Sequence, residues 1–180
     1  MYHMAVLYCR YEKLAESLVA FLCGSCHALK SLLIRYNPTG TEHLADQMPA
    51  EAYSKLLASM NRYVNGEEGL EEIYSMAIPQ AFPGFTGALS DREAFDCMTA
   101  VLSCIANPER RANLQLRHYR ARPRIWTHCC SKEHCYRCQT KDFHEGRSCE
   151  EHRNTLGVHL SDSSTGDCPS CGVCLAKGGQ

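Results

Sequence analysis

The sequence lacks an excess of charge of either sign. Its 19 lysine and arginine residues nearly balance 20 aspartate and glutamate residues, which gives a formal net charge of −1. A chain this close to neutrality has no global field that would attract nucleic acid or an anionic membrane. We therefore expect neither a nucleic acid nor a membrane surface as its partner.

Long hydrophobic runs are missing as well. The longest apolar stretch without charge near the start covers residues 17–29, which is too short to cross a bilayer as a helix. The start also has no basic segment followed by an apolar run and a small-residue cleavage site, as a secretory signal would. These absences predict an intracellular protein, and we expect it in the cytoplasm.

Motifs for several common chemistries are absent too. We find no internal repeat, no phosphate-binding glycine loop and no serine–histidine–acid motif. The 180 residues suffice for one domain with a core, or for a small domain followed by a metal-bound module.

Cysteine, in contrast, is abundant. Of the 13 cysteines, five lie in the first 128 residues and eight in the last 52. An odd number, strong clustering and the lack of a secretion signal speak against a disulfide framework. In a reducing compartment, such a cluster favours metal binding.

The region 1–126 is predicted to be mainly helical. Between residues 4 and 36, apolar side chains recur at steps of three, four or seven, which predicts one amphipathic helix that Asn37-Pro38 ends. This apolar stripe consists of Leu7, Tyr11, Leu14, Leu18, Leu22, Leu29, Leu32 and Tyr36.

Caps and breakers predict further helices. Pro49 can open a second helix, and Asn65-Gly66 can end it. The segment "EGLEEIYSMAIP" reads as a short third helix, and "PQAFPGFTG" reads as a loop.

A fourth helix is predicted from the capping-box spacing of Ser90 and Glu93. Asn107-Pro108 breaks it and starts another, which ends before Pro123. One face of the fourth helix carries Ala94, Cys97, Val101, Cys104 and Ile105.

The stretch "CCSKEHCYRCQTKDFHEGRSC" has the spacing of a zinc site. Cys135 and Cys138 form a Cys-x2-Cys pair, and His144 and Cys149 follow after five and four intervening residues. Zinc takes four ligands in a tetrahedron, and a short Cys-x2-Cys turn supplies two of them. Three thiolates and one imidazole would leave no position for water, so we predict a structural zinc ion. A segment this poor in apolar residues would depend on the metal for folding.

The ligand set leaves alternatives open. His134 or Cys130 could replace one of the four ligands. Further candidate ligands are Cys129, Cys130, Cys168 and Cys171.

Near the end of the chain, Cys174 reads either as a third thiolate beside Cys168 and Cys171 or, as we prefer, as a free thiol. A fourth ligand from His128, Cys129 or Cys130 would close a site shared across the linker.

The cysteine-rich stretch resembles the second half of an in-between-RING domain, a zinc domain of RING-between-RING ubiquitin ligases. Its final segment "CPSCGVCLAKGGQ" resembles the start of the catalytic RING2-like module of that family. The first resemblance rests on Cys130, Cys135, Cys138, His144 and Cys149, with Phe143 and Gly146, and the second on Cys168, Cys171, Lys177, Gly178 and Gly179.

This resemblance implies a division of the chain. A helical region at 1–126 would precede a partial zinc module at 127–153, a linker at 154–167 and a truncated RING2-like start at 168–180. It also implies transfer of ubiquitin through a cysteine thioester, with ubiquitin or a conjugating enzyme as partner.

Three departures from the family pattern speak against catalysis by this chain. The first 128 residues contain no eight-ligand RING, and the family's nucleophilic cysteine would fall at or just after Gln180. The upstream cysteines Cys97 and Cys104 fit a helical face better than the family's first zinc site. We therefore expect a partial family member that acts as a scaffold or a ubiquitin-pathway binding module. A full ligase whose sequence continues further is a third interpretation.

A zinc protein outside the ubiquitin system, for protein or RNA interaction, is the alternative. Six arginines between Arg110 and Arg124 could contact phosphates, and Tyr119 and Trp126 could stack on bases. A solvated helix is the plainer interpretation of this stretch.

The segment "CGSCH" at 23–27 matches a haem attachment pattern, but its place on the predicted helix favours core thiols.

Overall fold

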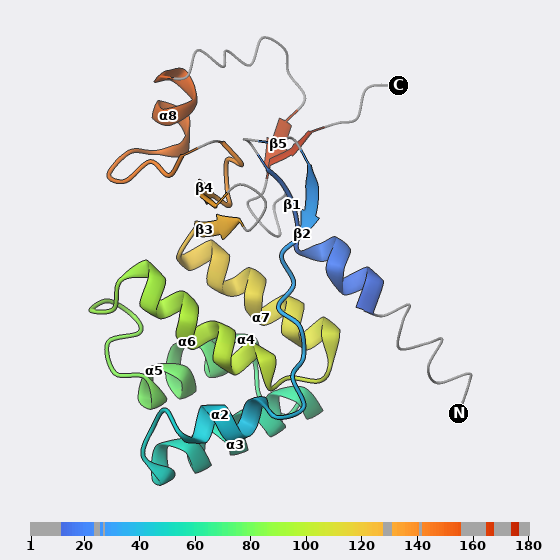
Figure 1. Cartoon of the computed structure of the whole chain (residues 1–180), viewed down its shortest axis with the longest axis vertical. Helices are drawn as coiled ribbons and strands as arrows, with labels where there is room; N and C mark the ends of the chain where they lie inside the picture. Colours follow the sequence, from blue (N-terminus) through green and yellow to red (C-terminus); the bar gives the residue numbers. More distant parts are fainter. Residues whose placement is uncertain are drawn as a thin grey trace. The chain divides into compact units, whose positions relative to one another are not determined.

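A computed structural model describes residues 12–23, 26, 28–127, 131–140, 142–155, 165–167 and 174–176. The chain divides into two compact units (Figure 1). The first, which we call the helical unit, comprises Met1–Ala20 and Ser31–His118. The second, the cysteine-rich unit, comprises Phe21–Lys30 and Tyr119–Gln180.

The helical unit is built from short and medium helices joined by tight turns. Residues 12–18 are helical, and an extended segment follows at 32–37. The further helices are α2 (Gly40–Ala45), α3 (Ala50–Asn65), α4 (Leu70–Glu72), the π-helical turn η1 (Ile73–Ala77), α5 (Ile78–Ala81), α6 (Asp91–Ser103) and α7 (Pro108–Ala121), of which α7 runs on into the second unit. None of the described helices is both long and apolar enough to span a bilayer.

Most of the predicted helix boundaries are confirmed. Pro49 directly precedes α3, and Gly66 ends it in a left-handed conformation with φ of 83°. Before α6, the Ser90 hydroxyl accepts a hydrogen bond from the Glu93 amide, and the Glu93 carboxylate accepts one from the Ser90 amide. The predicted capping box is therefore present.

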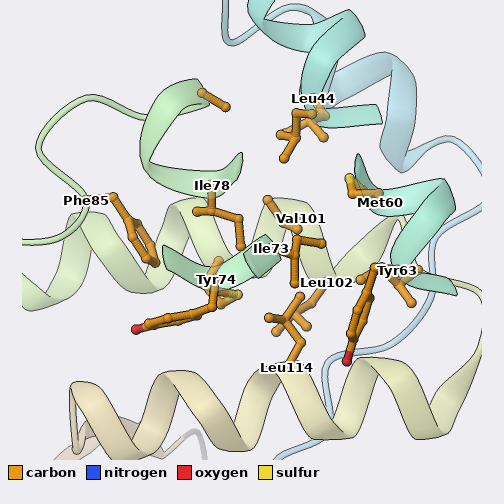
Figure 2. Close-up of a cluster of buried hydrophobic side chains, with 14 of the residues drawn as sticks. Leu44, Met60, Tyr63, Ile73, Tyr74, Ile78, Phe85, Val101, Leu102 and Leu114 are labelled. Carbon is orange, nitrogen blue, oxygen red and sulfur yellow. The ribbon is translucent and has the colours of Figure 1, made fainter. Parts of the chain in front are cut away.

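One hydrophobic core holds these helices together (Figure 2). The side chains of Tyr63, Ile73 and Leu114 meet there from three different helices. The Tyr63 hydroxyl donates to the Arg110 carbonyl at 2.9 Å, and burial raises the pKa of Tyr63 to about 12. The labelled members are Leu44, Met60, Tyr63, Ile73, Tyr74, Ile78, Phe85, Val101, Leu102 and Leu114.

The third predicted helix is present but continues further than expected. Pro79 lies near the start of α5, so the predicted loop begins only after Ala81. Pro79 has no amide hydrogen to donate to the Ser75 carbonyl, and its ring would crowd that carbonyl in a regular α-helix. The wider π-helical turn η1 directly before it accommodates this defect. The short helix α2 was not among the predicted elements.

The prediction of one helix over residues 4–36 is wrong. Its stripe residues Leu14, Leu18, Leu22 and Leu29 are 45–70% exposed. Val19, Phe21 and Cys23 are fully buried instead. These three alternate with more exposed neighbours, which is the period of a strand and not of a helix.

The described residues of the cysteine-rich unit form three two-stranded sheets and the short helix α8 (Cys149–Thr155). The strand pairs are β1 (Ala20–Leu22) with β2 (Leu29–Ser31), β3 (Arg124–Thr127) with β4 (Lys132–Cys135), and β5 (Thr165–Asp167) with β6 (Cys174–Ala176). Helix α8 lies between β4 and β5 in the sequence. In the antiparallel β3–β4 pair, Arg124 lies opposite Cys135. Cys135 is therefore the last residue of strand β4 and is positioned by the β3–β4 pairing.

The capping box of α6 gives a test of the helical unit. We expect Ser90→Ala to lower the free energy of unfolding by about 1 kcal/mol, because the Glu93 amide loses its acceptor. Urea denaturation of the full chain measures the change. Ser54→Ala, inside α3 and exposed, is the matched control, since its hydroxyl only bonds back to the Ala50 carbonyl. Equal stability of the two variants would contradict the prediction.

Candidate metal centre

Four side chains of the cysteine-rich unit gather their ligand atoms in one place. Cys135, Cys138, His144 and Cys149 each offer one atom, and these atoms all lie within 4.8 Å of one another. The Cys135 and Cys149 sulfurs are 3.8 Å apart, and the Cys138 sulfur is 3.4 Å from His144 Nε2. A tetrahedral zinc ion would set sulfur–sulfur edges of about 3.8 Å and sulfur–nitrogen edges of about 3.6 Å. The group is therefore close enough to bind a metal ion.

The two cysteines of the Cys-x2-Cys pair are held by a tight turn after β4. The Cys135 carbonyl accepts a hydrogen bond from the Gln139 amide at 2.9 Å. Gln139 adopts a left-handed conformation with φ of 55°, which folds the chain back on itself. Because of this turn, Cys135 and Cys138 point their sulfurs to one side.

The His144 ring is oriented by contacts with the protein. Its Nδ1 lies 2.8 Å from the Arg147 carbonyl and donates to it, and Nε2 is the nitrogen that faces Cys138. The ring is buried, stacks on Phe143, and lies 4.8 Å from the ring of His152. Such a carbonyl partner is the usual way in which proteins orient a metal-binding histidine.

Cys149 is the first residue of α8, and a second capping box fixes this helix start. The Ser148 hydroxyl accepts from the Glu151 amide at 3.1 Å, and the Glu151 carboxylate accepts from the Ser148 amide at 2.6 Å. These bonds also lower the pKa of Glu151. The helix start thus holds the Cys149 backbone beside the Cys-x2-Cys turn.

The three thiols share their protons unequally. The pKa of Cys138 is lowered to about 4, first because the Cys135 thiol donates to it and also through hydrogen bonds from Thr140 and His144. The pKa of Cys135 is raised because that hydrogen bond and burial hold its proton, and burial raises the pKa of Cys149. A bound divalent cation would stabilise the thiolate form of all three cysteines.

The structure describes few of the remaining predicted ligands. His134 does not join the group, since its Nδ1 lies 3.2 Å from the Thr140 carbonyl and its Nε2 lies 3.7 Å from the Cys23 sulfur. The other candidates lie outside the described residues, namely His128, Cys129, Cys130, Cys168 and Cys171. Of Cys174 the structure describes only the backbone, at the start of β6.

The upstream cysteines fall into two groups. Cys97 and Cys104 belong to α6 and its end, pack against the core of the helical unit, and have pKa values raised by burial. The sequence analysis predicted a helix for the "CGSCH" segment, and this prediction is wrong. Cys23 and Cys26 lie in the β1–β2 hairpin. Cys23 is buried as a core thiol would be, whereas Cys26 is exposed.

Several supporting residues were missed by the sequence analysis. The Thr140 hydroxyl lies 3.0 Å from the Cys138 sulfur. Arg124 pairs with Glu133 at 2.7 Å across the β3–β4 pair, and its guanidinium lies over the Phe143 ring at 4.9 Å. The hydrogen bond from Arg124 lowers the pKa of Glu133. Only the capping box at Ser148 carries a readable signal, since "SCEE" has the Ser-x-x-Glu spacing.

No family model, no curated protein and no solved structure matches this chain. The metal centre is therefore defined by its own geometry.

The left-handed residue after Cys138 gives a local test of the site. Gln139→Gly relieves the strain of this conformation, whereas Gln139→Val increases it, because a β-branched side chain disfavours positive φ. We expect the Val variant to bind Co²⁺ roughly tenfold more weakly than the Gly variant, as a penalty of about 1–2 kcal/mol would cause. Competitive titration with a chromophoric chelator measures the two affinities. Equal affinities would show that the turn does not govern metal binding.

The division into two units gives a test by metal removal. We expect a strong chelator to abolish amide-exchange protection in the segment 131–155, because few apolar contacts hold it. Protection in α3 and α6 should persist, since a hydrophobic core stabilises them. Hydrogen exchange with mass spectrometry reads both regions in one sample. Undiminished protection of 131–155 after complete chelation would contradict the prediction.

Proposed function

We propose that Cys135, Cys138, His144 and Cys149 hold one structural Zn²⁺ ion and that the resulting module is a protein-binding element. The observation that carries the first part is the approach of all four ligand atoms within 4.8 Å. A ligand set of three thiolates and one imidazole suits Zn²⁺ and does not suit Mg²⁺ or Ca²⁺, which prefer oxygen ligands.

The site is proposed as structural because the four protein ligands complete a tetrahedron. A catalytic zinc keeps a position for water or substrate, and this ligand set offers none. The contribution of the ion is then to fix the turn after β4, the loop around Phe143 and the start of α8 relative to one another. An ordered loop surface of this kind suits recognition of another protein.

For the partner, we propose a protein of the ubiquitin pathway, with ubiquitin itself or a conjugating enzyme as the first candidates. The support is the spacing from Cys130 to Cys149, which resembles the second half of an in-between-RING domain. We propose a binding or scaffolding role and not transfer of ubiquitin, because the described thiols that lie beside an imidazole are either buried, as Cys23 is, or part of the metal centre, as Cys138 is.

RNA binding is the weaker candidate, because the arginine-rich stretch is engaged within the protein. Arg111 is buried and pairs with Glu12 at 2.6 Å, and Arg117 binds Glu71 at 2.5 Å. Arg124 pairs with Glu133. Each of these pairs removes a cation that phosphates would otherwise contact.

Binding to ubiquitin is the test of this function. We expect the zinc-loaded full chain to shift backbone resonances of ¹⁵N-labelled ubiquitin, with a dissociation constant in the micromolar to millimolar range. Cys138→Ser should abolish the shifts together with the zinc ion of this centre, because the loops around that ion lose their order.

The matched control is Cys97→Ala, which changes a thiol of the helical unit and should leave the shifts intact. Zinc-loaded protein that produces no shifts with ubiquitin or with a panel of conjugating enzymes would refute the ubiquitin-pathway proposal. Salt-sensitive RNA binding lost on changing Arg117 and Arg120 would favour the alternative.

A further inference from the structure

A second pair of metal-binding side chains lies in the cysteine-rich unit, outside the four-residue group. The Cys23 sulfur lies 3.7 Å from His134 Nε2, and both residues are fully buried. This separation is close to the sulfur–nitrogen edge of about 3.6 Å that a tetrahedral zinc ion sets. The two residues are 111 positions apart in the sequence, so the fold itself creates this contact.

The His134 ring is oriented in the same way as the metal-site histidine. Its Nδ1 lies 3.2 Å from the Thr140 carbonyl and donates to it, which leaves the Nε2 lone pair directed at the Cys23 sulfur. The Phe21 ring meets the imidazole edge-on at 5.5 Å and restrains it further. A carbonyl partner on one nitrogen and a thiol on the other is the arrangement of a histidine prepared for a soft metal ion.

The β1–β2 hairpin supplies a second cysteine at the proper spacing. Cys26 follows Cys23 in a Cys-x2-Cys pair, and the Cys23 amide donates to the Ala28 carbonyl at 3.1 Å across the same turn. Cys26 is exposed, and joining the site would require its side chain to turn toward an ion that Cys23 and His134 hold. Such a hairpin turn is the usual source of two zinc ligands.

We propose that Cys23, Cys26 and His134 form a second site for Zn²⁺, separate from the four-residue centre. The two sites share no ligand. Thr140 lies between them, because its carbonyl accepts from His134 while its hydroxyl lies 3.0 Å from the Cys138 sulfur. Three protein ligands leave the fourth corner of the tetrahedron to a water molecule or a further side chain. The site would attach the β1–β2 hairpin to strand β4.

Counting zinc by native mass spectrometry of the full chain tests this proposal. We expect Cys26→Ser and His134→Phe each to hold one Zn²⁺ fewer than the wild type. Phe at 134 keeps an aromatic ring against Phe21 but has no nitrogen to bind metal. Cys138→Ser should also lose one, and Cys138→Ser combined with His134→Phe should lose two.

Two further variants separate loss of a ligand from loss of the fold. His134→Cys should keep the wild-type zinc count, because a thiolate replaces the imidazole as ligand. In the Co²⁺-loaded chain, the added thiolate should strengthen the sulfur-to-cobalt charge-transfer band. Cys97→Ala should keep the wild-type count, since this thiol lies in the helical unit.

An unchanged zinc count in Cys26→Ser or in His134→Phe would overturn the assignment and leave a thiol–imidazole hydrogen bond as the role of the Cys23–His134 contact. This outcome is independent of ubiquitin binding, which is measured on other variants.

Discussion

The convergence of Cys135, Cys138, His144 and Cys149 is the constraint on which the cysteine-rich unit depends. Three thiols and an imidazole lie within 4.8 Å in a segment that has few apolar side chains to bury. Three thiolates at this distance would repel one another strongly, and three protonated thiols would leave buried sulfur with weak hydrogen bonds. A divalent cation resolves both problems, because it neutralises the thiolates and replaces weak contacts with ligand bonds.

The surrounding backbone lowers the entropic cost of assembling that centre. The left-handed turn at Gln139 fixes Cys135 and Cys138, the carbonyl of Arg147 fixes His144, and the capping box at Ser148 fixes Cys149, all through local hydrogen bonds. Because each device spans only a few residues, little chain entropy is lost in closing loops between the ligands. Longer-range contacts, such as the Arg124–Glu133 pair, then secure the β3–β4 hairpin beside the centre.

Local signals in the sequence predicted much of this structure, and non-local contacts account for the errors. The capping box at Ser90, the end of α3 at Gly66 and the convergence of the four ligands follow from short patterns whose physics is local. The helix expected over residues 4–36 failed because steps of three, four or seven can be matched by leucines that remain exposed. The alternation of Val19, Phe21 and Cys23 in the same stretch indicates a strand, but short apolar runs fit either period.

The contact between Cys23 and His134 could not be predicted from the sequence. Spacing rules find ligands that lie close in the sequence, whereas this contact joins residues 111 positions apart. The two units also differ in the interactions that stabilise them. The helical unit buries a hydrophobic core to which helices from α2 to α7 contribute, so apolar burial stabilises it. The cysteine-rich unit joins its β1–β2 hairpin, β4 and α8 through sulfur and imidazole groups, together with ring contacts such as that of Phe21 with Tyr136. Its order, and any surface that it presents to a partner, should therefore follow the supply of metal while the helical unit does not.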